Sequence, residues 1–573
     1  MESKSDNTNT NINTNTNSIQ YGENNHIEYK WSNIQEEKIL QLSFQLVRTT
    51  DREKRYRLAI KFRECFETGT DSEKKILLKL LAHTRDIEEG KGEYALTHSI
   101  LSELGETHKS ICLEFIKYMV GYETSISPYG SWKDIKYLLN ELENCPSEIL
   151  DMMNNQLRKD RMIIDTNNNT NNNTNNNTNN NKNNCSLVAK WIPREKSKKF
   201  GWINKELAKN YYHEYGVHGW TKASLNKAQT HYRKLLTRIN KHIDTVQIKQ
   251  CGKKWKDINF DKVTSNTMMK QKKAFLNETI DTDDRKMCCK NILNYMKQVE
   301  SGEKTMKGSN TSIVDLVKHA LNVNGQMNNT NELNIINEIW KNNSSNTPEL
   351  ANMIAMVDTS ESMEYEDRNP LCSAIGLGCR VAEKSKLGRR VLTFNNRPSW
   401  INLANTDTLC DMVKAINDVP YGMNANLYKA MDLIIDGIVE TKMDIDEVNK
   451  LVLVVFSDMQ FDRHHNTDTD TGNTKEIEYV REIMDEKFHS AGMRICGKAY
   501  KTPHIIFWNL RSTDGFPELS YRPGYSMMSG YSSHSLNIFT QNELYGLESQ
   551  TPWKMLKKTL NNRRYNILEQ IIV

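Results

Sequence analysis

Apolar residues recur every three to four positions through the first quarter of the chain, the spacing that buries one face of a helix. The pattern predicts helices within residues 37–45, 76–81, 111–119 and 135–142. Polar breaks at residues 88–92, 105–108 and 127–131 predict the turns between them. Several helical hairpins in succession, without a fixed repeat length, indicate an α-helical array for the N-terminal module.

The pattern changes at about Leu350, where short apolar runs begin to alternate with amphipathic helical stretches. The runs at residues 353–357, 389–394, 451–456 and 504–508 predict strands. The stretches at residues 371–384, 408–416, 426–438 and 476–491 predict helices. Strands that alternate with helices form a parallel sheet covered on both faces, so this part predicts a doubly wound, Rossmann-like α/β domain.

Asparagine and threonine dominate two further stretches, which hold too few apolar side chains to offset the entropy cost of ordering. They account for much of the low hydrophobic share of the whole chain, 37%. The predicted units are a disordered tail (1–27), a helical module (28–165), an Asn-rich linker (166–184), a basic helical module (185–345), the α/β domain (346–545) and a C-terminal helical tail (546–573).

The basic module carries an uneven charge, which the net charge of +5 for the whole chain conceals. Residues 186–275 contain 21 Lys and Arg against 6 Asp and Glu, interleaved with Trp and Tyr. Phosphate neutralisation and stacking on aromatic rings are what a single-stranded nucleic acid needs. The candidate contacts are Lys190, Arg194, Lys198, Lys199, Arg233, Lys234, Arg238, Lys253 and Lys254. Alternatively, the aromatic residues form a helical core and the lysines its solvated face, or the basic face meets an acidic partner or a membrane surface.

Candidate metal chemistry follows the first predicted strand, in the string Asp358-Thr359-Ser360-Glu361-Ser362. A carboxylate and two hydroxyls at alternate positions can converge on one hard cation such as Mg²⁺. Asp458 follows a second predicted strand, and the carboxyl ends of parallel strands are where such sheets bind ligands. We therefore expect Asp358, Ser360, Ser362 and Asp458 to hold Mg²⁺ or another divalent cation, with Asp458 acting directly or through water.

This string resembles the metal-ion-dependent adhesion site of von Willebrand factor A domains, which begins with D-x-S-x-S after a hydrophobic strand. The resemblance implies a third ligand, a Thr before a helix, and a fourth, an Asp after a central strand. Asp458 matches the fourth ligand, whereas the position of the third is taken by Ala425. One hydroxyl ligand is then lost, and Asn424 or Asn426 could supply an amide oxygen instead.

Further motifs resemble an uncharacterised family of plants and giant DNA viruses that pairs a helical N-terminal module with a von Willebrand factor A domain. They are residues 85–93 (RDIEEGKGE), 130–134 (GSWKD), 189–193 (AKWIP), 232–234 (YRK), 456–462 (FSDMQFD) and 507–511 (FWNLR). The architecture is distantly similar to Ro proteins, in which a HEAT/TROVE-like ring of helices is closed by a von Willebrand factor A domain. That similarity implies structured or small non-coding RNA as a partner.

No nucleophile and base pair, phosphate-binding loop or set of four carboxylates is apparent, so we expect a non-enzymatic protein. The sequence predicts a metal-binding protein that acts on RNA or ribonucleoprotein. The alternative is a metal-dependent protein-interaction scaffold without nucleic acid, whose protein ligand offers a carboxylate to the metal. The chain shows no secretion signal or apolar span, so we expect a cytoplasmic or nuclear location in a host cell and no membrane partner.

Overall fold

The computed structural model describes most of the chain outside its Asn-rich stretches. The described residues are 19–142, 146–170, 185–277, 279–308, 310–324, 330–350, 352–420, 422, 425–462, 475–540 and 549–572. Most of the tail expected at residues 1–27 and of the linker expected at residues 166–184 therefore lies outside these ranges. Asn424 of the expected metal loop also lies outside them.

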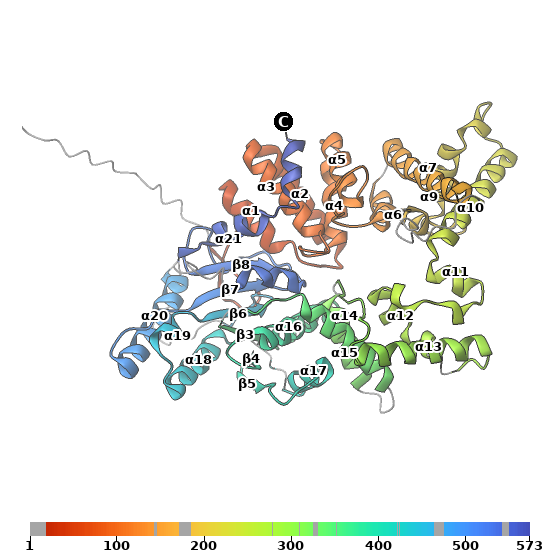
Figure 1. Cartoon of the computed structure of the whole chain (residues 1–573). Coiled ribbons are helices and arrows are strands. Elements are labelled where there is room, and N and C mark those ends of the chain that lie inside the picture. Colours follow the sequence, from red (N-terminus) through yellow and green to blue (C-terminus); the bar gives the residue numbers. More distant parts are fainter. Residues whose placement is uncertain are drawn as a thin grey trace, which may run out of the picture.

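After two short strands within residues 19–29, the first part of the chain is helical and forms an extended array. Its helices are α1 (Gln35–Gln45), α2 (Arg52–Thr68), α3 (Asp71–Arg85), α4 (Tyr94–Gly105), α5 (Lys109–Val120), α6 (Trp132–Glu141), α7 (Ser147–Thr170), α8 (Val188–Trp191), α9 (Gly201–Tyr211), α10 (Lys222–Ile243), α11 (Val246–Cys251), α12 (Ser265–Leu276), α13 (Asp283–Glu300), α14 (Ile313–Asn324) and α15 (Thr330–Ser345). Figure 1 shows the array leaving the sheet near α1, crossing the molecule to α10 and returning beneath through α11–α15. Within the described ranges, no helix is long and apolar enough to cross a membrane.

Side-chain caps fix where several of these helices begin. Asp51 accepts hydrogen bonds from the first backbone amides of α2, and Thr70 forms a capping box with Glu73 at the start of α3. Thr221 and Ser224 form the same arrangement at the start of α10. These contacts satisfy amides that have no partner within the helix, so the polar breaks in the sequence become helix boundaries.

The second part of the chain is an α/β domain built on a six-stranded sheet. Its strands are β3 (Met353–Asp358), β4 (Arg390–Phe394), β5 (Ser399–Asn402), β6 (Val452–Ser457), β7 (His504–Asn509) and β8 (Tyr525–Ser529). Its helices are α16 (Tyr365–Lys384), α17 (Leu409–Asn417), α18 (Leu427–Thr441), α19 (Ile445–Val448) and α20 (Lys475–Cys496). The order across the sheet is β5-β4-β3-β6-β7-β8, and every pair is parallel except β4 and β5. The predicted helical module plus α/β domain is therefore present; the sequence pattern missed β5 and β8.

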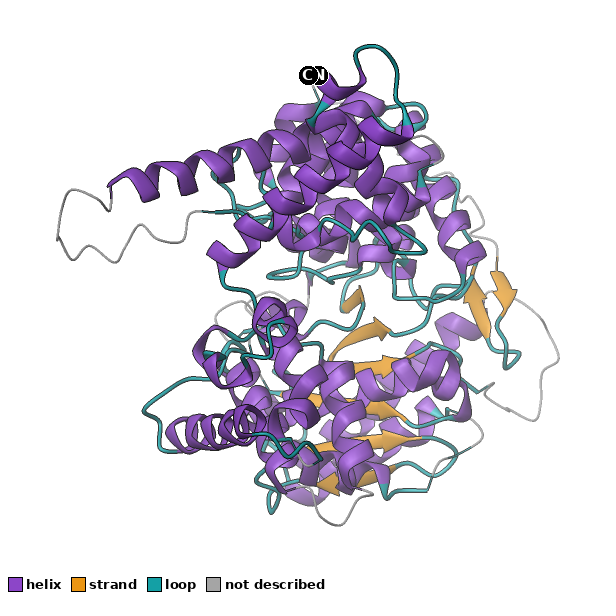
Figure 2. Ribbon diagram, turned by 90° about the vertical axis from the view of Figure 1, so that its right-hand side faces the viewer, coloured by secondary structure: helices purple, strands orange, loops and turns teal. Residues whose placement is uncertain are grey.

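The sheet separates two hydrophobic cores, because alternate residues of each strand point to opposite faces. Val452, Val454 and Phe456 of β6 join the core that contains α16, α17 and α12–α15. Leu453 and Val455 join the core that contains α18, α20 and the array from α1 to α10. Each end of the array thus continues the core of one face of the sheet. Figure 2 shows the strands inside the lower body, with helices around them and the first part of the array above.

A polar joint fastens the first helix of the array to the carboxyl edge of the sheet. The Lys91 ammonium donates to the Ser43 carbonyl (2.6 Å) and to Ser529 Oγ (2.7 Å) at the end of β8. Asn509 Nδ2, at the end of β7, donates to the Phe44 carbonyl (3.0 Å). The last carbonyls of a helix have no partner within it, so these donors complete the end of α1. Burial lowers the pKa of Lys91 to about 7.

A second buried cluster holds α3, α4 and α6 together. The Arg85 guanidinium donates to both carboxylate oxygens of Asp134 (3.0 and 2.7 Å), and His98 Nε2 lies 3.0 Å from Asp134 Oδ1. Burial alone would raise the pKa of Asp134, but contacts with His98 and Arg85 outweigh it and hold that pKa well below its ordinary value. A Cβ at Gly130 would lie 2.8 Å from Asp134 Oδ2, which explains the glycine at this position.

Two expected tails are in part ordered and packed. Residues 19–29 form a hairpin of β1 (Ile19–Tyr21) and β2 (Ile27–Tyr29), so the expectation of a disordered tail to residue 27 is wrong from residue 19 onward. Near the C-terminus, α21 (Pro552–Leu560) packs on β8, and the short helix η8 (Asn566–Ile571) packs on α3. Arg564 donates to both carboxylate oxygens of Asp86 (3.0 Å each), so the end of the chain contacts the helical module as well as β8.

The Asp134 cluster gives a test of what holds the array together. Asp134→Asn leaves Arg85 buried beside a neutral amide, and breaking a buried ion pair costs about 3 kcal/mol or more. We expect a clear fall in the urea midpoint, followed by helical circular dichroism. Glu148→Gln is the matched control, since its pair with Lys109 is exposed and is worth less than about 1 kcal/mol. Equal midpoints for the two variants would show that the cluster does not stabilise the array.

Candidate metal centre

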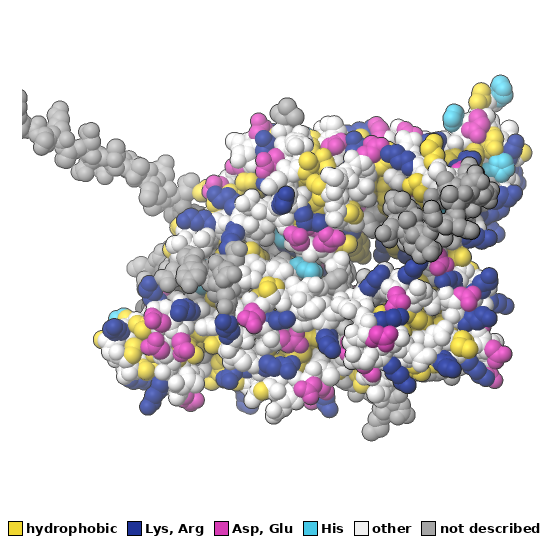
Figure 3. Space-filling model, in the orientation of Figure 1, with side chains coloured by type: hydrophobic (Ala, Val, Ile, Leu, Met, Phe, Trp, Pro, Cys, Tyr) yellow, Lys and Arg dark blue, Asp and Glu magenta, His cyan; other side chains and the backbone are white. Residues whose placement is uncertain are grey.

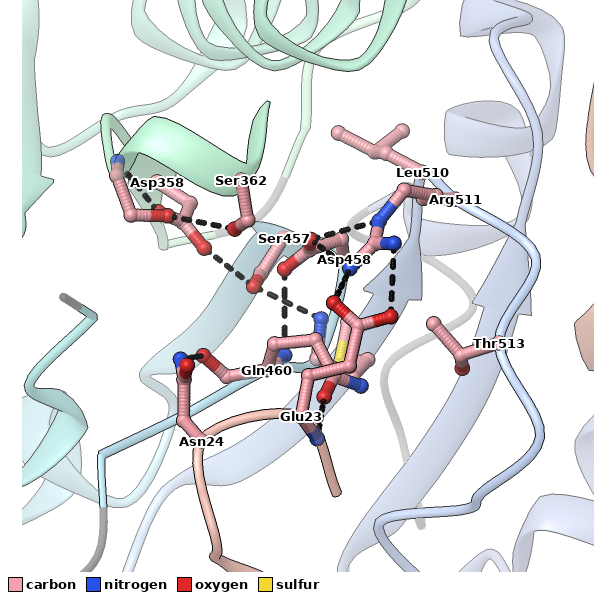
Figure 4. A network of polar contacts seen from close by, with 12 residues as sticks. Glu23, Asn24, Asp358, Ser362, Ser457, Asp458, Gln460, Leu510, Arg511 and Thr513 are labelled. Atoms are coloured by element: carbon pink, nitrogen blue, oxygen red, sulfur yellow. Dashed lines mark hydrogen bonds and ion pairs between the residues drawn. The ribbon is translucent and has the colours of Figure 1, made fainter. Parts of the chain in front are cut away.

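The sheet brings Asp358 and Asp458 to adjacent strand ends. Asp358 is the last residue of β3, and Asp458 directly follows β6, which pairs with β3. The chain order of the strands reverses between these two strands, and open α/β sheets bind their ligands at such a point. Both carboxylates are fully buried (0% exposed). Figure 4 shows the two side chains on either side of Ser457.

The string after β3 folds back on the Asp358 carboxylate. Ser360 N donates to Asp358 Oδ1 (2.9 Å), the turn that a short acidic side chain forms with its own backbone two residues on. Ser457 Oγ donates to Asp358 Oδ2 (2.5 Å), and the hydroxyls of Ser360 and Ser362 lie 3.1 Å apart. Asp358, Ser360 and Ser362 are therefore brought together, as their spacing predicts.

The electrostatics of this cluster favour a cation. Burial, followed by the charge of Asp458, raises the pKa of Asp358 to about 7. Among the described residues, no Lys or Arg pairs with Asp358. A carboxylate with two hydroxyls nearby is a donor set that suits Mg²⁺. The described residues hold no group of three or more His, Cys, Asp and Glu suited to a metal, so an ion here would depend on serine hydroxyls and water besides carboxylates.

Asp458 is already engaged by the protein. Its Oδ1 accepts from Gln460 N (3.2 Å), and its Oδ2 accepts from Nε (2.9 Å) and Nη2 (2.8 Å) of Arg511. Arg511 lies within the 507–511 motif, but the motif by itself does not indicate that it belongs to the site. Its position two residues after β7, at the same sheet edge, is the signal that could have found it. Asp458 can thus serve a cation through water, or directly once Arg511 moves.

The loop that was expected to supply the third metal ligand lies beside the cluster. Its described residues place no side-chain ligand there. Gly422 and Ser360 form a parallel bridge, and Ala425 forms another with Phe461. The Asn426 side-chain oxygen accepts from Lys429 N (2.9 Å) and caps α18, so a cation would have to share this oxygen with the start of the helix. Ala425 and Asn426 therefore fix the position of the loop backbone before α18.

The predicted nucleic-acid contacts are spread over α8–α11 and the loops beside these helices. Arg194, Lys198, Lys199, Lys234, Lys253 and Lys254 are exposed. Arg233 is paired with Glu195, and Arg238 with Asp165. Tyr211 and Tyr232 are buried in the helical core, so these two aromatic residues follow the packing alternative.

Lys190 instead belongs to a cluster that the sequence did not reveal. The lysine–aromatic cluster comprises Lys133, Lys136 and Lys190 with the rings of Tyr137, Trp191 and Phe200. The three ammonium groups lie 5.4–5.5 Å from the Trp191 ring centre, and within the described part of the chain none forms an ion pair. Burial lowers the pKa of each, and the charge of Lys270 on α12 lowers that of Lys133 further. In Figure 3, Lys and Arg gather over the right-hand part of the molecule, where the two runs of helices meet.

Comparisons with known proteins show similarity across most of the chain. Residues 352–568 match a domain of unknown function, DUF7788, and residues 145–347 match another domain of unknown function, DUF2828. The chain is 26% identical to "Uncharacterized protein L728" of Acanthamoeba polyphaga mimivirus over 525 residues, which cover 86% of this chain and 81% of that protein. The resemblance to giant-virus proteins is thereby supported, while none of these descriptions names a metal, an RNA or a von Willebrand factor A domain.

The raised pKa of Asp358 predicts how stability depends on pH when EDTA removes divalent ions. The folded-state pKa of about 7 lies above the ordinary value of about 3.9, so folding takes up a proton between these pH values. Stability should fall as pH rises through this window, by at most about 1.4 kcal/mol per unit. Asp358→Asn should remove this part of the fall, and the exposed control Asp436→Asn should retain it, as measured by urea unfolding. Parallel pH profiles for the wild-type chain and Asp358→Asn would contradict the assignment.

Proposed function

We propose that this chain is a non-enzymatic RNA-binding or ribonucleoprotein-binding protein whose α/β domain holds one divalent cation. The lysine–aromatic cluster carries the RNA part of the proposal. Three ammonium groups share aromatic surface and have no carboxylate partner in the described ranges. Such a surface offers phosphates a cation and offers bases a ring to stack on.

The α/β domain is, in this proposal, of the von Willebrand factor A type. Support comes from the strand order β5-β4-β3-β6-β7-β8 and from D-x-S-x-S at the end of β3. Asp458 stands at the end of the neighbouring strand, where that family has its distal aspartate. Ala425, in place of the family's threonine, and the Arg511 contact with Asp458 are the two departures. Both would alter cation affinity rather than the fold.

The helical array is, correspondingly, of the HEAT/TROVE-like type known from Ro proteins. Support comes from its path, because α1 packs on β8 while α14 packs on α16 and α17. The array therefore meets the α/β domain at both of its ends, as a ring of helices closed by a second domain would.

Asp358, Ser360 and Ser362 would hold the cation, and Asp458 would support it through water. A bound divalent ion with a free coordination position would supply a Lewis-acid contact for a partner's carboxylate. The residues of this chain do the rest: Ser457 orients Asp358, and burial of both carboxylates excludes competing solvent. RNA binding by the array does not require this ion.

A protein-interaction scaffold without nucleic acid is the alternative, and one observation favours it. Tyr211 and Tyr232 pack inward, and Arg233 and Arg238 are neutralised by ion pairs, so part of the basic module is an ordinary solvated helical face.

One experiment separates the two functions. The full chain is mixed with a pool of structured RNAs at about 50 and about 200 mM salt, each with Mg²⁺ and with EDTA. We expect binding that falls steeply with salt and survives EDTA. An absence of binding at the lower salt would exclude the RNA function and leave the metal-dependent scaffold.

The lysine–aromatic cluster gives a sharper prediction. Lys133→Gln with Lys136→Gln should weaken RNA binding about tenfold and lower the slope of log affinity against log salt by roughly 1.4 to 1.8, as expected for two lost phosphate contacts. The control is Lys450→Gln with Lys498→Gln, which removes the same charge from exposed positions before β6 and β7. Equal losses in both double variants would mean that net charge, not this cluster, determines binding.

A further inference from the structure

The N-terminal arm, defined as residues 19–29, lies against the α/β domain although the α/β domain begins more than 300 residues later in the chain. Its strands β1 and β2 form a hairpin, and Tyr29 exchanges backbone hydrogen bonds with Phe516 (2.9 and 3.1 Å). The turn of the hairpin, which contains Glu23 and Asn24, reaches the loop that follows β6. The arm therefore borders the candidate metal centre.

Two bridges connect the arm to the Asp458 carboxylate, and both are drawn in Figure 4. The Glu23 carboxylate accepts from Nη1 (2.9 Å) and Nη2 (2.7 Å) of Arg511, and Arg511 also donates to Asp458 Oδ2. Glu23 N donates to Gln460 Oε1 (2.7 Å), and Asn24 Nδ2 donates to the Gln460 carbonyl (2.9 Å). Gln460 N donates in turn to Asp458 Oδ1. Each carboxylate oxygen of Asp458 is thus linked to the arm through one intervening residue, Arg511 or Gln460.

The charges of this network do not balance. Asp358, Asp458 and Glu23 are three carboxylates, and Arg511 is the cation that pairs with two of them. With all groups ionised, the net charge is −2. The hydrogen bond from Arg511 lowers the pKa of Glu23, so Glu23 keeps its charge at neutral pH. One divalent cation would bring the network to neutrality, and Glu23 is part of the charge that it would neutralise.

We propose that the N-terminal arm and a divalent cation at Asp358 stabilise each other, with Glu23 acting as the third carboxylate of the centre through Arg511. This inference rests on the proposed cation site. Without Glu23, Arg511 has Asp458 as its remaining carboxylate partner in the network, and its positive charge opposes a cation there. With Glu23 in place, the guanidinium is shared, and the added negative charge favours the cation.

Linkage makes the effect reciprocal. If the docked arm raises cation affinity by some factor, the cation raises docking of the arm by the same factor. Because couplings of this kind are typically about 5-fold or more, both sides of the linkage are measurable.

The test uses the full chain as wild type, Glu23→Gln, Glu23→Asp and Glu36→Gln. Glu36 is an exposed carboxylate in the first turn of α1, so Glu36→Gln removes the same charge outside the network. Isothermal titration with Mg²⁺ gives the affinity, and amide hydrogen exchange of residues 19–29 with Mg²⁺ or EDTA gives the docking of the arm. Glu23 is 54% exposed, so its substitution leaves the core packing intact.

We expect Mg²⁺ to bind about 5-fold or more weakly to Glu23→Gln, and equally well to wild type and Glu36→Gln. Glu23→Asp, which keeps the charge, should retain most of the affinity. Mg²⁺ should slow exchange in the arm of the wild type but not of Glu23→Gln. Equal Mg²⁺ affinity for wild type and Glu23→Gln, or arm exchange that ignores Mg²⁺, would overturn this inference and leave the cation site standing. No Mg²⁺ binding by the wild type would overturn both.

Discussion

The candidate metal centre and the attachment of the helical array both depend on the edge of the sheet where its parallel strands end. Successive strands end there in Asp358 (β3), Ser457 (β6), Asn509 (β7) and Ser529 (β8). Two of these ends form the candidate metal centre, and the other two complete the end of α1. Parallel strands necessarily bring their carboxyl ends to one edge, so the joint and the site arise from the same topology.

Hydrophobic burial holds the helical array against both faces of the sheet. Helices α1–α10 continue one core and α12–α15 the other, so separating the array from the domain would expose apolar surface on both sides. The buried ion pair Arg85–Asp134 adds direction to the packing within the array, and Arg564–Asp86 ties the end of the chain to it, since a buried charge is tolerated only beside its partner.

Local patterns were enough to predict much of the fold and the core of the site. Short apolar runs placed the four central strands, amphipathic stretches placed the helices between them, and strand ends placed Asp358 and Asp458 at one edge. Ser360 and Ser362 followed because the contacts of Ser360 with Asp358 and with Ser362 are made within a few residues.

The sequence alone could not predict contacts between residues that are far apart along the chain. Glu23 and Arg511 are 488 positions apart, and nothing local to either indicates the other. The arm is polar and short, and it is ordered by contacts with Gln460 and Phe516 rather than by its own propensity. Residues 88–92 were expected to be only a turn between helices, yet Lys91 in this turn, and Arg85 and Asp86 just before it, each pair with a residue of another element.

Crystals of the full chain soaked in Mn²⁺, which prefers the same oxygen ligands as Mg²⁺, would test the central claim most directly. The account predicts one anomalous difference peak at coordination distance from Asp358, Ser360 and Ser362, with the N-terminal arm still paired to Arg511. Anomalous peaks elsewhere and none beside Asp358 would contradict it, and the buried carboxylates would then have to be explained by the Arg511 contact and a shared proton alone.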